Sequence, residues 1–299
     1  MTPAPKYTGP ERRKRPRWRP RPIRVLIILL LISAVGYAVA VMWLIGRETQ
    51  LVFEAGNTPA TGRPAFPYEQ IDVPRTDRVQ QFAWVMRTGN SDSGPWVLYL
   101  HGNASSVASQ VNIAHYRVLR NAGLNVLAPE YRGFGGVQGA PTEAALQADA
   151  RAAYDYLLDV RHVPPHAILI YGWSLGAAVA VDMASRVPPA AMILEGAPAS
   201  LVDLAARRYP FFPLRLFMRS SFDSIRKIGA IPTPILFLHS TDDEVIPISE
   251  GRRLHEAARG AKMFVELKGG HMEAIEQSAD VLEQTIRDFV GAYGRGAGM

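Results

Sequence analysis

Apolar positions divide the chain into two parts with different patterns. Residues 25–45 form one apolar run in which only Ser33, Gly36 and Tyr37 are mildly polar. At a rise of about 1.5 Å per residue, a helix of this length spans about 31 Å. That length matches the hydrocarbon core of a bilayer. The run therefore predicts a transmembrane helix over residues 25–46.

From residue 68 onwards, short apolar runs alternate with segments of helical periodicity. The short runs predict strands at residues 68–73, 79–86, 96–100, 125–129, 167–173, 190–194, 235–238 and 262–267. The other segments predict helices at residues 105–122, 142–160, 175–187, 249–259 and 278–292. Apolar strands separated by helices are typical of an α/β fold with a doubly wound, mostly parallel sheet that is covered on both faces.

Charge separates the first residues from the rest. Residues 1–24 are rich in Pro and hold nine Lys and Arg against one Glu, whereas the whole chain has a formal net charge of +6. We therefore expect a disordered basic tail. The slightly acidic remainder argues against nucleic acid as a partner. Residues 47–67 carry scattered Pro, Gly and Thr and predict a linker to a folded domain over residues 68–299.

The basic residues lie before the apolar run, and this asymmetry predicts the membrane topology. The positive-inside rule places the N-terminus in the cytoplasm and everything after Gly46 in the periplasm or another exoplasmic space. We expect a single-pass protein of a bacterial inner membrane. A cleaved signal peptide is the alternative, because Ala38 and Ala40 have the spacing of a cleavage site. The continuation of the apolar run to Ile45 favours the uncleaved anchor.

The main chemical signal lies where a predicted strand meets an alanine-rich helix. The junction reads Gly172-Trp-Ser174-Leu-Gly176. A strand that turns into a helix so sharply strains the central Ser, and the flanking glycines permit close packing. The hydroxyl then lies beside a helix N-terminus, which favours negative charge. Such a string also arises by chance, but its strand-turn-helix context predicts that Ser174 is a nucleophile.

A serine nucleophile needs a base, and three histidines follow Ser174 in the chain. His239 ends a predicted strand before any suitable acid, and His255 falls inside a predicted helix. His271 instead follows two glycines, directly after the strand at residues 262–267. Loops at the carboxyl ends of parallel strands face ligands. We therefore predict His271 as the base.

The carboxylate that orients this base should lie on the loop after the preceding strand. Asp242, Asp243 and Glu244 occupy that loop. Glu195, which ends the strand that follows the nucleophile, is a further candidate for the acid, but we favour its interpretation as a buried structural carboxylate. The residue pattern alone leaves both aspartates open.

An oxyanion hole needs two backbone N–H groups near the nucleophile. Leu175, the next residue, is expected to supply one of them. The other is expected from the loop after the third predicted strand, where Gly102 lets the backbone turn in. Asn103, or else Ala104, would offer the N–H there. We interpret His101 in this loop as a residue that shapes the loop.

Six motifs follow one another along the chain: LYLHGNASS, PEYRGFGG with PTE, YGWSLGAAVA, ILEGAP, HSTDDEVIP and KGGHME. Together they resemble the α/β-hydrolase superfamily and, within it, membrane-anchored serine hydrolases of the serine aminopeptidase-like and protein-depalmitoylase branches. In that family the acid is followed by two or three residues and then Pro, so the resemblance implies that Asp243, ahead of Pro247, is the acid. It also implies a pocket wall at residues 131–133 and a short lid at residues 197–234.

These residues predict a serine hydrolase that cleaves a carboxylic ester or thioester of a small molecule or lipid through an acyl-enzyme intermediate. Ser174 would attack the carbonyl, His271 would shuttle the proton and Asp243 would hold His271. The alternatives are an aminopeptidase-like amide hydrolase and a hydrolase-fold protein that binds a lipid or partner without turnover. The chain has no cysteine, which excludes disulfides and thiolate nucleophiles. No metal or organic cofactor is implied.

Overall fold

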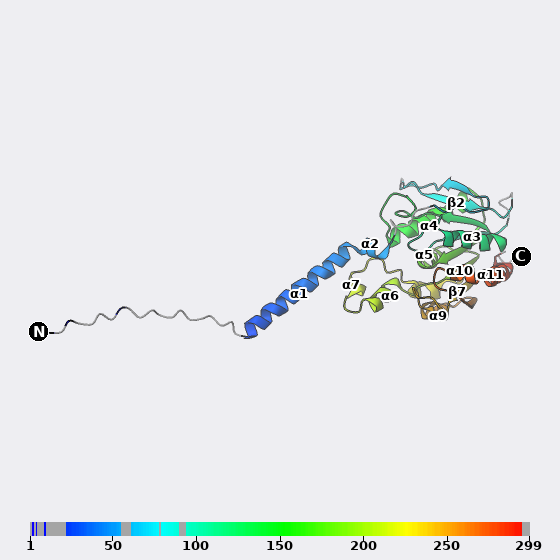
Figure 1. The fold of residues 1–299 in the computed structure, drawn as a ribbon. Coiled ribbons are helices and arrows are strands. Elements are labelled where there is room, and N and C mark those ends of the chain that lie inside the picture. The colour runs from blue at the N-terminus through cyan, green and yellow to red at the C-terminus, as the bar shows by residue number, and fades with distance from the viewer. Residues whose placement is uncertain are drawn as a thin grey trace. The chain divides into compact units, whose positions relative to one another are not determined.

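The computed structural model describes residues 22–54, 61–77, 79–89 and 94–294, together with Thr2, Ala4 and Gly9. Most of the tail expected over residues 1–24 and residues 55–60 of the expected linker lie outside the described residues. The chain divides into two compact units, one up to Gly46 and one from Arg47 on. Figure 1 shows the helices and strands of both units.

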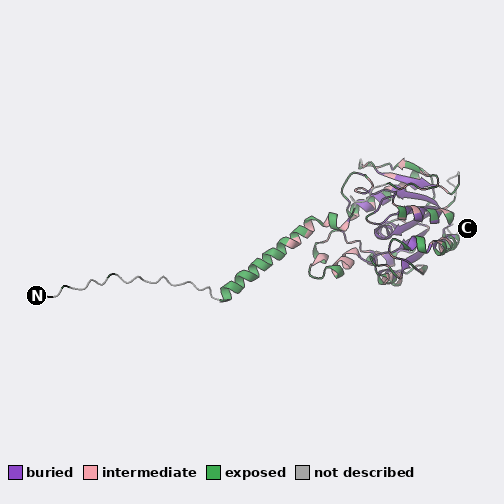
Figure 2. Cartoon of the chain, in the orientation of Figure 1, coloured by how far each residue is buried: buried purple, intermediate pink, exposed green. Residues whose placement is uncertain are grey.

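The first unit contains one long helix, α1, which spans Pro22–Gly46. None of its residues is buried, and Figure 2 shows it mostly exposed, with intermediate residues toward its C-terminal end. By length and composition, α1 is the one described helix that is able to cross a membrane. It begins three residues before the predicted helix and ends at the same residue.

The second unit is built on one sheet of eight strands in the order β1-β2-β4-β3-β5-β6-β7-β8. The strands are β1 (Glu69–Asp72), β2 (Phe82–Met86), β3 (Trp96–Leu100), β4 (Asn125–Pro129), β5 (Ile168–Trp173), β6 (Ala191–Glu195), β7 (Ile235–Ser240) and β8 (Lys262–Leu267). Strand β2 pairs antiparallel with β1 and β4, and the pairs from β4 to β8 are parallel. The predicted α/β class with a mostly parallel sheet is confirmed.

Helices cover both faces of this sheet. The helices of this unit are α2 (Glu48–Val52), α3 (Gln110–Asn121), α4 (Glu143–Asp159), α5 (Leu175–Ala184), α6 (Leu201–Arg208), α7 (Leu214–Phe217), α8 (Ser224–Lys227), α9 (Ile248–Ala257), α10 (Ala274–Gln277) and α11 (Ala279–Tyr293). Short 3-10 segments lie at Pro165–Ala167 and Ile228–Ala230. Side chains of α3, α10 and α11 pack in one core, and those of α4, α5, α8 and α9 pack in the other.

Alternation along the strands assigns side chains to the two cores. In β3, Trp96, Leu98 and Leu100 enter the core under α4 and α5, whereas Val97 and Tyr99 enter the core under α3. Successive side chains of a strand point to opposite faces, so a strand covered on both sides is apolar throughout. This is why the predicted strands read as continuous apolar runs.

Helix α5 packs unusually close to the sheet because its residues are small. All ten of its residues are buried. A Cβ on Gly172 would lie 2.4 Å from the Cα of Ala177, and one on Gly176 would lie 2.0 Å from the carbonyl oxygen of Leu100. Both glycines are therefore required where β5 turns into α5.

The helix predicted from residue 105 begins only at Gln110. The residues before it form a buried turn, in which Asn112 Nδ2 donates to the carbonyl oxygen of Ser106 over 2.6 Å. Ser106 N also donates to Ser109 Oγ over 2.9 Å. These local side-chain bonds compete with helical ones, and they hold the loop that runs beside Ser174.

Candidate active site

Ser174 lies at the turn between β5 and α5 in a backbone conformation that residues with a side chain rarely adopt. Its φ is 55° and its ψ is −119°. The turn is fixed to the neighbouring strand, because Ser174 N donates to the carbonyl oxygen of Glu195 over 2.8 Å. Strain of this kind collects at functional sites and persists only where the surrounding structure holds it.

The structure brings the side chains of Ser174, His271 and Asp243 together. His271 Nε2 lies 2.9 Å from Ser174 Oγ, and His271 Nδ1 lies 2.7 Å from Asp243 Oδ2. The three residues follow β5, β8 and β7, so the parallel strands deliver them to one edge of the sheet. With Nδ1 protonated and bound to the carboxylate, Nε2 presents a lone pair to the serine hydroxyl.

Asp243 is held on both of its carboxylate oxygens. Oδ1 accepts the backbone N–H groups of Val245, at 2.9 Å, and Ile246, at 2.7 Å. Burial raises the pKa of Asp243, but the hydrogen bond and charge of His271 outweigh it, so the pKa lies below its usual range. The carboxylate is therefore ionised at neutral pH. Asp242, the other aspartate that the sequence left open, is exposed.

His271 is enclosed by the residues around it and is only 7% exposed. Its ring stacks on Trp173, with centroids 5.6 Å apart. A Cβ on Gly196 would lie 3.2 Å from His271 Cε1. The backbone N–H of His271 donates to Glu244 Oε2 over 3.2 Å. These contacts limit the imidazole to the orientation in which it faces Ser174.

The loop after β3 runs directly against Ser174. A Cβ on Gly102 would lie 3.1 Å from Ser174 Cβ and 2.9 Å from the Trp173 ring. Leu175 is the first residue of α5, and the first N–H groups of a helix have no partner within it. The loop and the helix start thus flank the serine from two sides, as an oxyanion hole requires. The role of Asn103 and Leu175 in such a hole stays a prediction.

Two buried pairs of His and Glu support these loops. His101 Nδ1 lies 2.8 Å from the carbonyl oxygen of Gly102, and its Nε2 lies 2.9 Å from Glu130 Oε1. His115 Nδ1 lies 2.7 Å from the carbonyl oxygen of Val111, and its Nε2 lies 2.9 Å from Glu195 Oε2. All four side chains are buried. Each imidazole thus links a buried carboxylate to a backbone carbonyl group.

Glu195 is placed beneath the site and contacts His115 and Tyr171. Burial raises the pKa of Glu195, but the charge and hydrogen bond of His115 more than compensate, and the pKa is lowered. The sequence pattern indicates no partner for Glu195, Glu130 or His115. No local pattern pairs them, because His115 and Glu195 are 80 residues apart.

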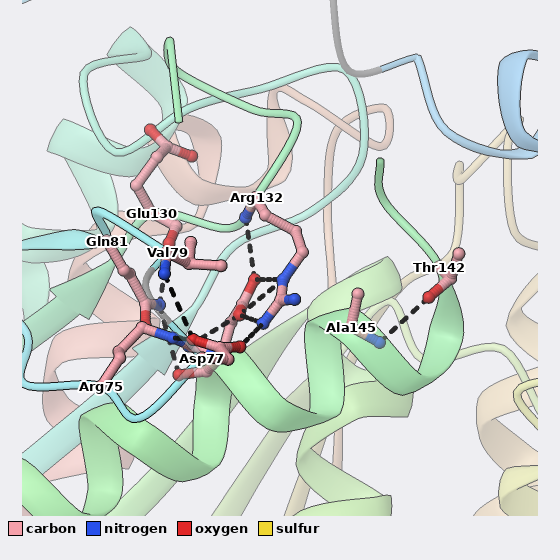
Figure 3. A network of polar contacts seen from close by, with 9 residues as sticks. Arg75, Asp77, Val79, Gln81, Glu130, Arg132, Thr142 and Ala145 are labelled. Atoms are coloured by element: carbon pink, nitrogen blue, oxygen red, sulfur yellow. Dashed lines mark hydrogen bonds and ion pairs between the residues drawn. The ribbon is translucent and has the colours of Figure 1, made fainter. Parts of the chain in front are cut away.

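The segment expected to form a pocket wall is held from behind by an ion-pair network (Figure 3). Arg132 N donates to Asp149 Oδ2 over 2.8 Å, and Arg132 Nε donates to Asp149 Oδ1 over 2.9 Å. Arg75 contacts the same carboxylate at 2.7 Å and also binds Asp77. The hydrogen bond from Arg75 holds the pKa of Asp77 well below its usual range. Tyr131 is buried against the ring of His101.

Residues 197–234, the expected lid, contain α6, α7 and α8. Four large apolar side chains in this stretch are exposed: Tyr209, Phe211, Leu216 and Phe217, with Phe211 85% and Leu216 78% accessible. Arginines lie between them, and Arg215 pairs with Asp203 over 2.8 Å. Apolar surface of this kind marks interaction sites.

No group of three or more metal-ligating side chains is found among the described residues.

Comparison with known proteins identifies the family. Residues 95–219 match the family model for the alpha/beta hydrolase fold, and residues 219–293 match the one for TAP-like protein. An uncharacterized protein of Mycobacterium tuberculosis is 33% identical over 270 residues, which cover 89% of this chain and 95% of that protein. The lysophosphatidylserine lipase ABHD12 of Danio rerio is 30% identical over 207 residues, which cover 63% of this chain and 53% of the lipase.

Among solved structures, the esterase Pf2001 of Pyrococcus furiosus has the same fold. It superposes with a TM-score of 0.65 at 20% identity, covering 81% of this chain and 98% of the esterase. Fold, sequence relatives and family models agree, and together they support hydrolase activity. The chain is therefore a member of the α/β hydrolase family.

Proposed function

We propose that the protein is a serine hydrolase that uses Ser174, His271 and Asp243 as its catalytic triad. The observation that carries this proposal is the continuous hydrogen-bonded chain from Asp243 through His271 to Ser174 Oγ. The strained backbone of Ser174 supports it, because strain of this kind collects at functional sites.

The geometry supports an acyl-enzyme mechanism. His271 Nε2 takes the proton from Ser174 Oγ as the oxygen attacks the substrate carbonyl, and the imidazolium is stabilised by Asp243. The backbone N–H groups of Leu175 and Asn103 would bind the negative oxygen of the tetrahedral intermediate. His271 then gives its proton to the leaving alcohol or thiol, and an acyl-serine remains. Water, activated by His271, hydrolyses this ester and restores the serine.

The substrate class is proposed as a carboxylic ester or thioester, including lipid esters. The exposed apolar side chains of the lid support a substrate with an acyl chain. A relative named as a lysophosphatidylserine lipase and a structural neighbour named as an esterase point to the same class. The apolar helix α1 would hold the enzyme at a membrane, where such substrates reside.

A substrate panel tests this proposal. The full-length protein in detergent is given p-nitrophenyl acetate, butyrate and octanoate, a lysophospholipid, an acyl thioester and aminoacyl p-nitroanilides, with Ser174→Ala as the blank. We expect turnover of esters or thioesters that the Ser174→Ala protein lacks. A preference for the anilides would establish amide hydrolysis instead, and turnover equal to that of Ser174→Ala would refute the serine mechanism.

The location is proposed from α1 and the basic residues that precede it. The helix would be an uncleaved anchor in a bacterial inner membrane, with the catalytic domain on the periplasmic side. A C-terminal alkaline phosphatase fusion, active only outside the cytoplasm, should be active in intact cells. Activity of a reporter that works only in the cytoplasm would reverse this topology.

A further inference from the structure

A short segment directly after α1 is bound to the loop beside the nucleophile. We call residues 47–54, which include α2, the strap. Asn103 Nδ2 donates to the carbonyl oxygen of Val52 over 2.8 Å, and Glu54 N donates to Asn103 Oδ1 over 3.1 Å. Both ends of the Asn103 amide are therefore taken up by the strap backbone, much as a neighbouring strand would pair with it.

The strap is also anchored by a buried side chain. Phe53 is 3% exposed and belongs to the core between the sheet and α5. Its ring meets that of Phe222 edge to face, with the centroids 6.1 Å apart. Burial of an aromatic side chain is a large favourable contribution, so the strap is a packed part of the domain.

The other end of the strap holds the lid. Glu48 Oε1 accepts the backbone N–H groups of Arg219, at 2.7 Å, and Ser220, at 2.8 Å. Phe222 follows with a φ of 40°, and its N–H donates to Glu143 Oε2 over 3.0 Å. The lid stretch from Arg219 to Phe222 is thus held by two glutamates, one from the strap and one from α4.

These contacts join the strap to two parts of the site. Gly102 packs against Ser174, so the peptide that links Gly102 to Asn103 lies beside the nucleophile. The side chain of Asn103 is bound to the strap. The backbone N–H of Asn103 is the group that would donate to the substrate oxygen. A shift of the strap would move this peptide, and small displacements of an oxyanion donor are costly for the rate.

We infer that the strap is a positioning element of the active site, which sets the Asn103 peptide through Val52 and Glu54 and the lid through Glu48. This inference rests on the proposed serine hydrolase function. The segment that tethers the domain to α1 would thus also tune catalysis. Loosening it should lower the rate while the contacts of the triad stay intact.

A matched pair of variants at Glu54 tests the connection to the oxyanion loop. Glu54→Pro removes the N–H that binds Asn103, whereas Glu54→Ala keeps it, and the Glu54 side chain is exposed. Phe53 has φ −110° and ψ 107°, the extended conformation that a residue before proline prefers. For soluble p-nitrophenyl butyrate and the full-length protein, we expect Glu54→Pro to lower kcat about three- to tenfold with KM nearly unchanged. Glu54→Ala should match the wild type.

A second pair at Glu48 tests the connection to the lid. Glu48→Ala removes the acceptor of the Arg219 and Ser220 N–H groups, whereas Glu48→Gln keeps an amide oxygen there. We expect Glu48→Ala to raise KM for a long-chain ester several-fold with a smaller effect on kcat, and Glu48→Gln to restore KM. If a melting curve shows that Glu54→Pro is unfolded, the Glu48 variants test the inference in its place.

The outcomes distinguish a failure of the proposed hydrolase function from a failure of the proposed role of the strap. If wild type and Ser174→Ala turn over the ester equally, the proposed function fails. If wild type is active and the folded Glu54→Pro protein has the kcat of Glu54→Ala, the strap does not position the oxyanion loop and the inference is overturned. If Glu54→Pro is unfolded, a KM for Glu48→Ala equal to that of wild type overturns it.

Discussion

One carboxylate oxygen of Asp243 contacts His271, and the other accepts hydrogen bonds from the backbone. Oδ2 lies 2.7 Å from His271 Nδ1, while Oδ1 accepts the N–H groups of Val245 and Ile246. The carboxylate is thereby fixed in direction before any substrate binds. This arrangement explains why an aspartate followed by Glu, Val, Ile and Pro occupies this loop.

Replacement of Asp243 should damage catalysis far more than replacement of its neighbour. Asp243→Asn keeps the shape but removes the charge that holds His271 in the tautomer with a free Nε2. We expect kcat for an ester to fall by about 10⁴-fold. Asp242→Asn, at the exposed adjacent position, should keep the wild-type rate. Similar losses in the two variants would contradict the assignment of Asp243.

The same residue should contribute stability that depends on pH. The folded pKa of Asp243 lies below the ordinary value of 3.8 that it takes in the unfolded chain, so the ionised carboxylate favours folding. The contribution is complete above the unfolded pKa and is lost as the pH falls through the folded one. We expect the urea midpoint of wild type minus that of Asp243→Asn to decrease as the pH falls below about 4. A difference that increases toward low pH would contradict this linkage.

Alanine substitution should destabilise the protein to different extents at two adjacent glycines after β4. Gly135 and Gly136 both have positive φ, at 51° and 90°. A Cβ on Gly135 would lie 2.1 Å from Glu130 Oε2, whereas Gly136 has nothing within 4 Å. Glu130 cannot move away easily, because it is bound to His101.

Alanine at each position measures this difference. Gly136→Ala should cost only the strain of its backbone, about 1–2 kcal/mol of unfolding free energy. Gly135→Ala should cost at least about 2 kcal/mol more, because it also displaces the buried carboxylate. Thermal unfolding of the two proteins provides the comparison. Equal melting temperatures would show that the pair of His101 and Glu130 does not hold this loop.

The lid should matter for long acyl chains and not for short ones. Leu216 is 78% exposed, and contact with an acyl chain would bury it. Loss of a buried leucine contact is worth about 1.5–3 kcal/mol, or roughly tenfold or more in kcat/KM. Leu216→Ser should therefore lower kcat/KM for an octanoate ester by about tenfold and leave the acetate ester unchanged. Val160→Ser, an exposed position at the end of α4, is the control.

If Leu216→Ser changed the acetate and octanoate esters equally, the side chain would be acting on the fold and not on the substrate. If neither ester responded, the exposed apolar side chains of the lid would have no part in binding the acyl chain. Initial rates over a range of substrate concentrations below the micelle threshold distinguish these cases.

The fold and the strained serine could be predicted because their signals are local. Apolar runs broken by helical periodicity specify a covered parallel sheet, and the glycines around Ser174 specify a turn that only glycine permits. The position of His271 followed from the strand before it. Asp243 could not be separated from Asp242 by pattern alone, because the choice depends on which carboxylate the loop turns inward.

The supporting contacts could not be predicted because they join distant segments. The pair of His115 and Glu195 requires helix α3 to be placed against β6, and the pair of His101 and Glu130 requires β3 and β4 to be placed side by side. The strap lies in a stretch whose sequence predicts a linker. Its proposed role depends on a contact with Asn103, about 50 residues away. Helix α3 starts late because the side chains of Ser109 and Asn112 bind the backbone of Ser106 in the preceding turn.

Reaction with a fluorophosphonate is the most direct test of the claim that Ser174 is an activated nucleophile. The full-length protein and Ser174→Ala are treated with the reagent, and the adduct is located by peptide mass spectrometry. The account predicts one adduct, on Ser174, in the wild type and none in Ser174→Ala. An unmodified wild type, or an adduct that persists in Ser174→Ala, would contradict it.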